Sequence, residues 1–516
     1  MITTQQTDRA VGAIIGMATG DALGAGYEFG LPLADGAPVF MKGGGGFEWE
    51  PGEWTDDTSM AIPILDALAA GGSIDEDAIV VRWVDWARTA KDVGVQTRAV
   101  FGRMPTATAR DARASARQVH DATGRSAGNG SLMRTAPVAL GFLDDPVALA
   151  VAARSLSDLT HFEQDAGDAC VLWSLAIRHA ILTGELEVRV GILSLDSDRQ
   201  DRWLALIDEA EAKQPRDFER NGWVVQALQG AWSAIHHSTS FADALERAVR
   251  GGRDTDTVAA IAGGLIGAAT GVSGIPAHWR RLLRGWPGIT GRDLARNAVL
   301  AVRGGTADSR GWPSAQHFPP SEADTLVEHP HDDGVLLASL AGLRRLPAGI
   351  GSVVSLCRVG AHETDLETIE FWLVDRTGAN ANLRFTIEDA ADTIAALRAE
   401  GKTVVVHCFE ARSRTPAVAS AYSARHLGIP ARQALDEVLA VLPGNLLNEE
   451  FRSIVTETRR ADNTRCAQCG GAALPIVWGL PAGPMEGVVL GGCGISDRDP
   501  TQECAVCNYR FGLIGR

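Results

Sequence analysis

Two short polar stretches that lie far apart in the chain place the strongest constraint on its fold. Thr55-Asp56-Asp57-Thr58 and Asp254-Thr255-Asp256-Thr257 each combine carboxylates with hydroxyls, and each precedes an apolar stretch. Carboxylates spaced this closely repel one another, and a bound divalent cation relieves the repulsion. Oxygen ligands suit Mg²⁺, Mn²⁺ or Ca²⁺ rather than zinc. The sequence therefore predicts a fold that brings the two stretches together as halves of one cation site.

The chain from about residue 8 to residue 304 shows the apolar spacing that is typical of helices. The connections are rich in Gly, Pro and Asp, and no convincing alternation of a strand is present. The clearest helical segments are Val11 to Leu23, Met60 to Ala70, Val147 to Leu156, Ala166 to Leu182, Trp223 to Ile235, and Val258 to Ala269. Many short Ala-rich helices predict one compact all-α domain over residues 1–304.

Residues 305–330 change in character, because they carry Gly, Ser, Pro, Asp and His with little periodicity. This composition indicates a linker or a surface excursion. His329 and His331 lie at its end, beside Asp332 and Asp333. We interpret this group as a solvated loop, and a metal site is the alternative.

Residues 331–460 alternate between strand and helix patterns. The expected strands are Gly351 to Val359, Thr368 to Val374, and Thr403 to Val406. The expected helices are Ile387 to Glu400, Pro416 to His426, Ala431 to Val441, and Glu449 to Arg459. Strands interleaved with helices predict a small α/β domain with an at least partly parallel sheet.

The last segment, residues 461–516, has little apolar periodicity and two Cys-x-x-Cys pairs, Cys466/Cys469 and Cys504/Cys507. Four thiolates form a closed tetrahedral Zn²⁺ site, which stabilises a segment with too small a core to fold alone. We expect a zinc ribbon that is structural or that docks a protein partner. Cys493 is expected to be a spare cysteine, and Cys170 and Cys357 are expected to be core thiols.

The net charge of −16 argues against non-specific binding to nucleic acid or to an anionic membrane. No apolar run free of charge reaches membrane-spanning length. The start of the chain lacks the basic and apolar regions of a signal peptide. We therefore expect a cytoplasmic protein without a membrane partner, for which nucleic acid is not an expected partner either.

Further polar residues interrupt the helices of the first domain, namely Glu28, the loop Gly128-Asn129-Gly130-Ser131 and Thr160-His161. A single Asp/Thr stretch is explained by a helix N-cap, whereas two such stretches with a Gly-Asn-Gly loop favour a site. These motifs resemble the ADP-ribosylglycohydrolase family, whose members include the dinitrogenase reductase-activating glycohydrolase. The resemblance extends through the whole predicted all-α domain.

The resemblance implies an all-helical fold with two Mg²⁺ or Mn²⁺ ions in a cleft. It also implies an activity that removes ADP-ribose from a protein side chain or from a related compound. Glu28 matches the glutamate near the substrate ribose. The residues that match the family's metal ligands are Thr55, Asp56, Asp57, Asp254, Asp256 and Thr257, and those that match residues holding ADP-ribose are Gly128, Asn129, Gly130, Ser131 and His161.

The residue types suit this chemistry without the resemblance. Paired cations can hold vicinal hydroxyls, polarise a sugar and activate a water. Cleavage of a glycosidic bond also needs a carboxylate near the anomeric carbon, and Glu28 is the candidate. The alternative for Glu28 is a surface glutamate after a glycine-rich turn. The glycines of the loop allow its backbone N–H groups to approach a pyrophosphate.

A second chemistry is centred on Cys408, which follows the strand-like run Val404-Val405-Val406-His407 and precedes Arg414 by six positions. A cysteine ahead of a helix start is a candidate thiolate nucleophile, and loop N–H groups with Arg414 can surround a phosphate. Thr415 can donate a hydrogen bond to the leaving thiolate.

This pattern resembles the cysteine-dependent protein tyrosine phosphatases, particularly the dual-specificity branch. Asp375 stands where the family has its general acid, and Asn448 matches a residue that braces the phosphate loop. Arg412 adds positive charge that favours a phosphate-rich ligand. The family usually has glycine where this chain has Ala411, and an alanine there is strained if the position needs a positive φ.

The sequence thus predicts a bifunctional hydrolase built from three modules. The expected partners are an ADP-ribosylated protein or an ADP-ribose-containing small molecule, and a phosphorylated substrate. The alternative is a binding protein for ADP-ribose and phosphate, in which the phosphatase-like domain is inactive and serves recognition.

Overall fold

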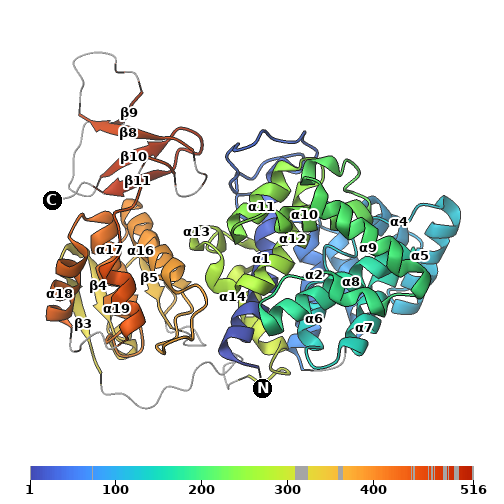
Figure 1. Cartoon of the computed structure of the whole chain (residues 1–516), viewed down its shortest axis with the longest axis horizontal. Helices are drawn as coiled ribbons and strands as arrows, with labels where there is room; N and C mark the ends of the chain where they lie inside the picture. The colour runs from blue at the N-terminus through green and yellow to red at the C-terminus, as the bar shows by residue number, and fades with distance from the viewer. Residues whose placement is uncertain are drawn as a thin grey trace. The chain divides into compact units, whose positions relative to one another are not determined.

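The computed structural model describes residues 2–71, 74–307, 323–357, 364–442, 444, 448–462, 464–466, 469, 471–479, 485, 487–492 and 499–513. It divides into two compact units, Met1–Pro313 and Ser314–Arg516, both visible in Figure 1. Within the described residues, no helix is both long enough and apolar enough to cross a membrane.

The first unit is helical, as the sequence predicts, apart from the two-residue antiparallel strands β1 (Arg284–Gly285) and β2 (Ile289–Thr290). Its short 3-10 helices are η1 (Ala25–Tyr27), η2 (Arg189–Ser194), η3 (Pro215–Asp217) and η4 (Val272–Gly274). Its α-helices are α1 (Thr4–Gly24), α2 (Asp56–Ala69), α3 (Glu76–Ala87), α4 (Val95–Phe101), α5 (Ala109–Thr123), α6 (Val138–Gly141), α7 (Pro146–Asp158), α8 (Gln164–Thr183), α9 (Ser197–Ala212), α10 (Val224–His236), α11 (Phe241–Arg250), α12 (Thr255–Thr270), α13 (Ala277–Arg280) and α14 (Gly291–Ala301).

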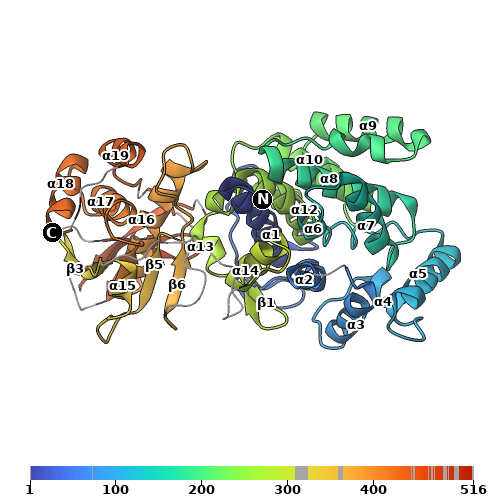
Figure 2. The same cartoon turned by 90° about the horizontal axis from the view of Figure 1, so that it is seen from below.

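Helices α1 and α12 touch backbone to backbone, and Figures 1 and 2 show them side by side. A Cβ on Gly16 would lie 2.2 Å from the carbonyl oxygen of Gly263, and a Cβ on Gly12 would lie 2.2 Å from that of Gly267. Glycine at these positions therefore lets the two antiparallel helices approach closely. The contact continues to the last residue of α1, Gly24, which lies against Asp256 at the start of α12.

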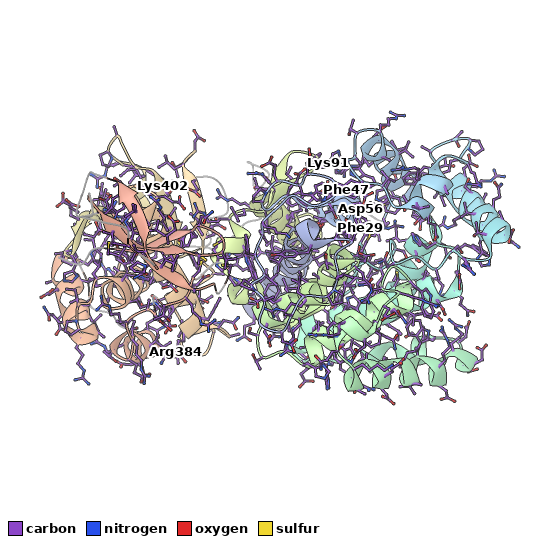
Figure 3. All side chains as sticks on the ribbon, turned by 90° about the horizontal axis from the view of Figure 1, so that it is seen from above. Phe29, Phe47, Asp56, Lys91, Arg384 and Lys402 are labelled. Carbon is purple, nitrogen blue, oxygen red and sulfur yellow. The ribbon has the colours of Figure 1, made fainter. Side chains whose placement is uncertain are left out.

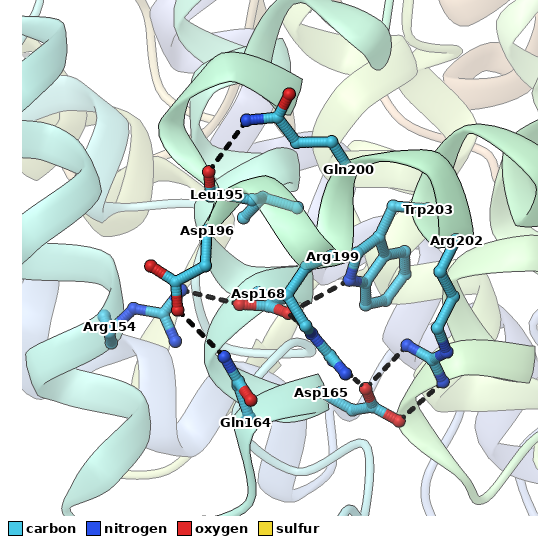
Figure 4. A network of polar contacts seen from close by, with 10 residues as sticks. All are labelled: Arg154, Gln164, Asp165, Asp168, Leu195, Asp196, Arg199, Gln200, Arg202 and Trp203. Carbon is cyan, nitrogen blue, oxygen red and sulfur yellow. Dashed lines mark hydrogen bonds and ion pairs between the residues drawn. The ribbon is translucent and has the colours of Figure 1, made fainter.

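A network of ion pairs and hydrogen bonds joins helices α7, α8 and α9 (Figure 4). The carboxylate of Asp168 is fully buried and accepts hydrogen bonds from Arg154 Nη2 at 2.6 Å, Arg199 Nε at 2.8 Å and Trp203 Nε1 at 3.1 Å. Asp165 pairs with Arg199 and with Arg202. The network satisfies its buried charges and fixes the spacing of the three helices.

Replacement of Asp168 by alanine is expected to destabilise the first unit by about 2–3 kcal/mol, because Arg154 and the buried Trp203 N–H lose their acceptor while Arg199 keeps Asp165. Urea unfolding followed by circular dichroism on the full chain measures this change. The control is Asp208→Ala, which removes an exposed partner of Arg189 and should change the unfolding free energy by less than about 1 kcal/mol. Equal effects of the two substitutions would contradict the prediction.

The second unit contains a five-stranded sheet of order β3-β4-β7-β5-β6, in which β3 is antiparallel to β4 and the other neighbours are parallel. The strands are β3 (Leu326–His329), β4 (Asp332–Ala338), β5 (Ser352–Ser355), β6 (Glu367–Glu370) and β7 (Val404–His407). The helices are α15 (Leu340–Leu343), α16 (Leu383–Ala399), α17 (Arg414–His426), α18 (Ala431–Val441) and α19 (Glu449–Thr456). All four residues of the central strand β7 are buried.

The first two strands of this sheet were not among the expected ones, and β3 begins inside the stretch expected as a linker, residues 305–330. Residues 308–322 of that stretch lie outside the described residues. The expected strand from Thr368 to Val374 ends at Glu370 in the structure. Of the expected strand Gly351 to Val359, Ser352–Ser355 is a strand, and its last two residues are not described.

His329 and His331 do not lie in a solvated loop, which corrects the interpretation from the sequence. His329 is buried, and burial lowers its pKa to about 4. His331 contacts Ser423 through Nδ1 and Glu437 through Nε2. Asp332 next to them accepts two hydrogen bonds from Arg398, both at 2.9 Å. These contacts hold the edge of the sheet to its helices.

The C-terminal part of the second unit is a four-stranded sheet of order β11-β10-β8-β9. Its strands are β8 (Ala473–Trp478), β9 (Val489–Gly492), β10 (Pro500–Cys504) and β11 (Arg510–Leu513). The pairs β10–β11 and β10–β8 are antiparallel, whereas β8–β9 is parallel. Cys493, the expected spare cysteine, lies outside the described residues.

Candidate functional site

Three helix ends meet at one place in the first unit: the end of α1, the start of α2 and the start of α12. The carboxylate of Asp21, in the last turn of α1, accepts from the backbone N–H of Thr55 at 2.8 Å and of Thr58 at 2.9 Å. Thr255 Oγ1 donates to the carbonyl of Gly24 at 2.9 Å, which fixes α12 to the same end of α1. Both polar stretches are therefore held on one helix end, and the predicted convergence is present.

The carboxylates at this junction form two overlapping groups. In one group, ligand atoms of Asp21, Asp57 and Asp256 lie within 4.8 Å of one another, and in the other those of Glu28, Asp254 and Asp256 do. Oδ1 of Asp57 and Oδ1 of Asp254 are buried and have no hydrogen-bond partner among the residues that the structure describes. Buried carboxylate oxygens without a donor are the arrangement that hard cations satisfy, so the donor set fits divalent ions such as Mg²⁺.

The protonation of these groups reflects the same crowding. Burial, followed by repulsion between neighbouring carboxylates, raises the pKa of Asp56, Asp57 and Asp256 well above the usual range. Burial and the charge of Asp254 raise the pKa of Glu28 to about 9. With a pKa of about 9, Glu28 therefore keeps its proton at neutral pH when no cation is bound.

Glu28 is held next to Asp254 by a strained two-way backbone pairing. Phe29 N–H donates to the carbonyl of Arg253 at 2.6 Å, and Arg253 N–H donates to the carbonyl of Gly30 at 2.7 Å. Phe29 has a φ of 64° and Arg253 a φ of 66°, and this left-handed region is unfavourable for residues other than glycine. Strain of this kind is characteristic of functional sites and here fixes the candidate catalytic carboxylate beside a candidate ligand.

The carboxylates open into a cleft of about 500 Å³. Its rim carries exposed apolar side chains, among them Phe29, of which 69% is exposed, and Figure 3 shows Phe29, Phe47 and Lys91 near Asp56. The residues that line it include Glu28, Asp56, Asp92, Gln96, Gly128, Asn129, Gly130, His161, Asp254, Asp256 and Thr257.

The Gly-Asn-Gly loop is attached directly to the carboxylate cluster. Asn129 Nδ2 donates to Asp254 Oδ2 at 2.8 Å and to the carbonyl of Asn221 at 3.0 Å. Ser131 is different, because it does not line the cleft. It is buried and its hydroxyl accepts a hydrogen bond from Ser157 at 2.9 Å. The structure therefore brings Asn129 and both glycines to the cleft and leaves Ser131 beneath it.

Reasoning from the sequence missed three residues of this site. Asp21 lies in the last turn of α1 among glycines, and its role at the start of α2 depends on a tertiary contact that the sequence does not show. Asp92 lines the cleft, and Asn221 donates to the carbonyls of Gly252 and Asp254. For these two we find no sequence pattern that points to the site.

A second candidate site lies at the carboxyl end of β7. Cys408 is buried there, and Arg414 and Thr415 begin α17. Within the described part of the chain, Arg414 Nε and Thr415 Oγ1 are buried without a hydrogen-bond partner, whereas Arg414 Nη1 donates to the carbonyl of Leu373 at 3.1 Å. Orphaned donors at the start of a helix, in the loop and turn that follow a cysteine, are suited to an anion.

Asp375 and Asn448 face this loop. Asp375 Oδ1 accepts from Ser413 Oγ at 2.9 Å and from Asn448 Nδ2 at 3.3 Å. Ala411 has a φ of 58°, so the position does require a positive φ, and alanine there is strained. The Arg412 side chain is 54% exposed and forms a 3.8 Å ion pair with Glu410.

The four paired cysteines form a third cluster. Their sulfurs all lie within 4.8 Å of one another, with Cys466–Cys507 at 3.6 Å, Cys469–Cys504 at 3.3 Å and Cys469–Cys507 at 3.4 Å. Tetrahedral zinc with bonds of 2.3 Å separates its sulfurs by about 3.8 Å. The geometry therefore fits one tetrahedral ion. Burial and the neighbouring thiols raise the pKa of Cys469 to about 12.

Comparison with known proteins connects the first unit to one family. The sequence model of the ADP-ribosylglycohydrolase family matches residues 2–308. The ADP-ribosylarginine hydrolase Tri1 of Pseudomonas putida (strain GB-1) is 33% identical over 53% of this chain and 74% of its own length. The ADP-ribosyl-[dinitrogen reductase] glycohydrolase of Rhodospirillum rubrum is 30% identical over 53% of this chain and 89% of its own.

The chain is also similar, over part of its length, to a mouse putative dual specificity phosphatase solved with zinc tungstate. The identity is 23% and the TM-score 0.23, over 28% of this chain and 92% of that one. A likeness at this level does not assign an activity to the second unit. The match to residues 2–308 spans more than half of the chain and includes every residue of the cleft described above. The chain therefore belongs to the ADP-ribosylglycohydrolase family.

Proposed function

We propose that the first unit hydrolyses the bond between ADP-ribose and arginine side chains of modified proteins, with two Mg²⁺ or Mn²⁺ ions in the carboxylate cluster. The observation that carries the proposal is the pair of carboxylate groups that share Asp256 at the base of a cleft lined by Asn129 and His161. The arginine linkage is supported by the similarity to the ADP-ribosylarginine hydrolase of Pseudomonas putida. The acidic cleft also complements a guanidinium group.

The chain's own residues divide the work as follows. Asp57, Asp254 and Asp256 hold the ions with Thr55, Asp56 and Thr257, while Asn129 and His161 hold ADP-ribose. Glu28 accepts a proton from the water that attacks the anomeric carbon. The electron pair of the broken carbon–nitrogen bond stays on the guanidine nitrogen, which takes up a proton as it leaves. When bound, the ions supply positive charge, clamp the ribose hydroxyls and polarise the sugar.

The test is release of free ADP-ribose from an ADP-ribosylarginine peptide by the full chain with Mg²⁺ or Mn²⁺. ADP-ribosylserine peptide serves as the comparison substrate. Release from the arginine peptide and not from the serine peptide supports the proposal. Release only from serine overturns the linkage, and no release from either overturns the hydrolase assignment.

Divalent cations are expected to stabilise the first unit more at pH 8 than at pH 5.5. Glu28 and the buried aspartates have raised pKa values in the metal-free fold, so that fold loses stability as pH rises from about 4.5 towards 9. Cations bind the deprotonated carboxylates and so offset this loss. At a cation concentration 100 times Kd, binding adds about 2.7 kcal/mol to the free energy of unfolding. Thermal unfolding with and without Mg²⁺ measures it, and a larger cation effect at pH 5.5 would contradict the prediction.

We further propose that the α/β part of the second unit is a cysteine-dependent phosphatase. Cys408 would attack phosphorus, Arg414 and Arg412 would hold phosphate oxygens, Asp375 would protonate the leaving oxygen, Thr415 would donate to the thiolate, and Asn448 would brace the loop. The orphaned donors of Arg414 and Thr415 support this proposal. A phosphate-binding module without turnover is the second candidate, which the strained Ala411 favours.

The last proposal is one structural Zn²⁺ held by Cys466, Cys469, Cys504 and Cys507 in the C-terminal ribbon. The sulfur separations support it. Elemental analysis should find one zinc per chain, and none in a Cys469→Ser/Cys504→Ser variant. Equal zinc in both proteins would place the ion elsewhere.

A further inference from the structure

Arg134 is a buried cation near the cleft to which the proposed chemistry gives no role. Only 1% of the residue is exposed, and its guanidinium lies 4.1 Å from the ring centre of Trp83. It donates to the carbonyl of Leu156 at 3.2 Å and to Thr160 Oγ1 at 2.7 Å. Among the described residues it forms no ion pair. Burial of a charge is costly, and these contacts, a further contact of Nη1 to Met60 Sδ at 3.7 Å and the charge of Asp56 offset part of that cost.

The hydrogen bond to Thr160 determines where the proton of that hydroxyl can go. Arginine can only donate, so Thr160 Oγ1 must be the acceptor in its contact with Arg134. Thr160 Oγ1 also lies 2.7 Å from Nδ1 of His161, and this nitrogen is the one recorded acceptor for the hydroxyl proton within the described part of the chain. When Nδ1 accepts, a neutral imidazole carries its own proton on Nε2.

Nε2 of His161 lies between the two glycines of the loop. A Cβ on Gly128 would lie 3.3 Å from Nε2, and a Cβ on Gly130 would lie 3.2 Å from it. Side chains at these positions would crowd the nitrogen, whereas the glycines leave it facing the cleft that His161 lines. No protein acceptor is recorded for Nε2 in the described residues.

We infer that Arg134 and Thr160 hold His161 in the tautomer with its proton on Nε2, and that this N–H donates to a phosphate oxygen of ADP-ribose. The identity of the ligand rests on the proposed function, and the tautomer does not. Arg134 and Thr160 are positioning residues, since neither reaches the cleft. Burial and then the charge of Arg134 lower the pKa of His161 well below its usual value, so the ring remains neutral.

The tautomer is measured by nitrogen NMR on the full chain labelled with ¹⁵N-histidine. A His161→Gln spectrum identifies the His161 signals by their absence. We expect protonated Nε2 and unprotonated Nδ1 in the wild type and in Thr160→Ser, and a mixture of tautomers in Thr160→Val. A proton on Nδ1 in the wild type overturns the inference, and so does a doubly protonated ring.

The ligand contact is measured by calorimetry with ADP-ribose and with ADP as separate probes. Thr160→Val should weaken both by about tenfold, which corresponds to about 1.4 kcal/mol, and Thr160→Ser should stay within about twofold of the wild type. A loss for ADP-ribose alone would overturn the phosphate assignment, because ADP shares the pyrophosphate. Unchanged binding in a folded Thr160→Val variant would overturn the donor role.

Failure of the proposed function and failure of the tautomer assignment give different results in these experiments. If the wild type binds neither probe, the proposed function fails, while the NMR result still decides the tautomer. If Thr160→Val does not fold, the spectra of the wild type and of Thr160→Ser still test the tautomer. Absence of the proton from Nε2 of His161 in either protein contradicts the proposed role of Arg134 and Thr160.

Discussion

Replacement of Asp256 by asparagine is expected to lower ADP-ribose release on the order of 10³-fold, which corresponds to about 4 kcal/mol of lost transition-state stabilisation. Asp256 is the one carboxylate that belongs to both groups at the base of the cleft, so its loss weakens both cation positions together. Asparagine keeps the shape of the side chain and removes its charge. Turnover of the arginine peptide at saturating Mg²⁺ measures the effect.

The free energy of unfolding of Asp256→Asn distinguishes loss of cation binding from misfolding. In the absence of cations, Asp256→Asn should be at least as stable as the wild type, because it removes one of several repelling buried carboxylates. With Mg²⁺ the order should reverse, since only the wild type gains the full binding energy. The matched control is Asp198→Asn in the first turn of α9, where the side chain is exposed. Activity of Asp256→Asn within tenfold of the wild type would exclude it as a ligand.

Replacement of Cys408 by serine is expected to reduce hydrolysis of an aryl phosphate by at least about 10³-fold, because loss of a nucleophile removes the covalent route. Binding of inorganic phosphate should persist, since Arg414 and the loop remain. The control is Cys170→Ser, a buried cysteine of the first unit. Hydrolysis of the aryl phosphate and binding of inorganic phosphate are both measured on the full chain.

The outcomes distinguish an enzyme from a binding module. Equal turnover by the wild type and Cys408→Ser would show that Cys408 is not the nucleophile. Phosphate binding by both proteins without turnover by either would establish the recognition role and contradict the phosphatase proposal. Release of ADP-ribose should be the same in both proteins, because the carboxylate cluster lies in the other unit.

The helical class of the first unit follows from the sequence because amphipathic spacing and helix starts are local features. The convergence of Thr55–Asp57 with Asp254–Thr257 was also predictable, since repeated acidic residues at two helix starts need a common counter-charge. The sequence does not reveal the helix contact that brings the two stretches together. Gly12 and Gly16 are four residues apart in the sequence, but only the folded structure shows that they pack against Gly267 and Gly263.

Other features depend on backbone conformations that the residue type conceals. Phe29 and Arg253 adopt positive φ although neither is glycine, so no turn pattern marks the pairing that holds Glu28. His329 illustrates a different limit. Its strand is short and is followed by a turn at Pro330, so the surrounding composition resembles a loop although the histidine is buried. Short edge strands rarely carry enough periodicity to be identified.

The contact between α1 and α12 also sets an order of events when the protein is made. Chains grow at about 5–20 residues per second, so α1 emerges on the order of tens of seconds before α12 exists. During that interval its glycine face has no partner, and pairing over such a sequence separation is a slow step of folding. Cation binding is therefore a property of the finished unit alone. A cation-dependent signal during synthesis would report the arrival of α12.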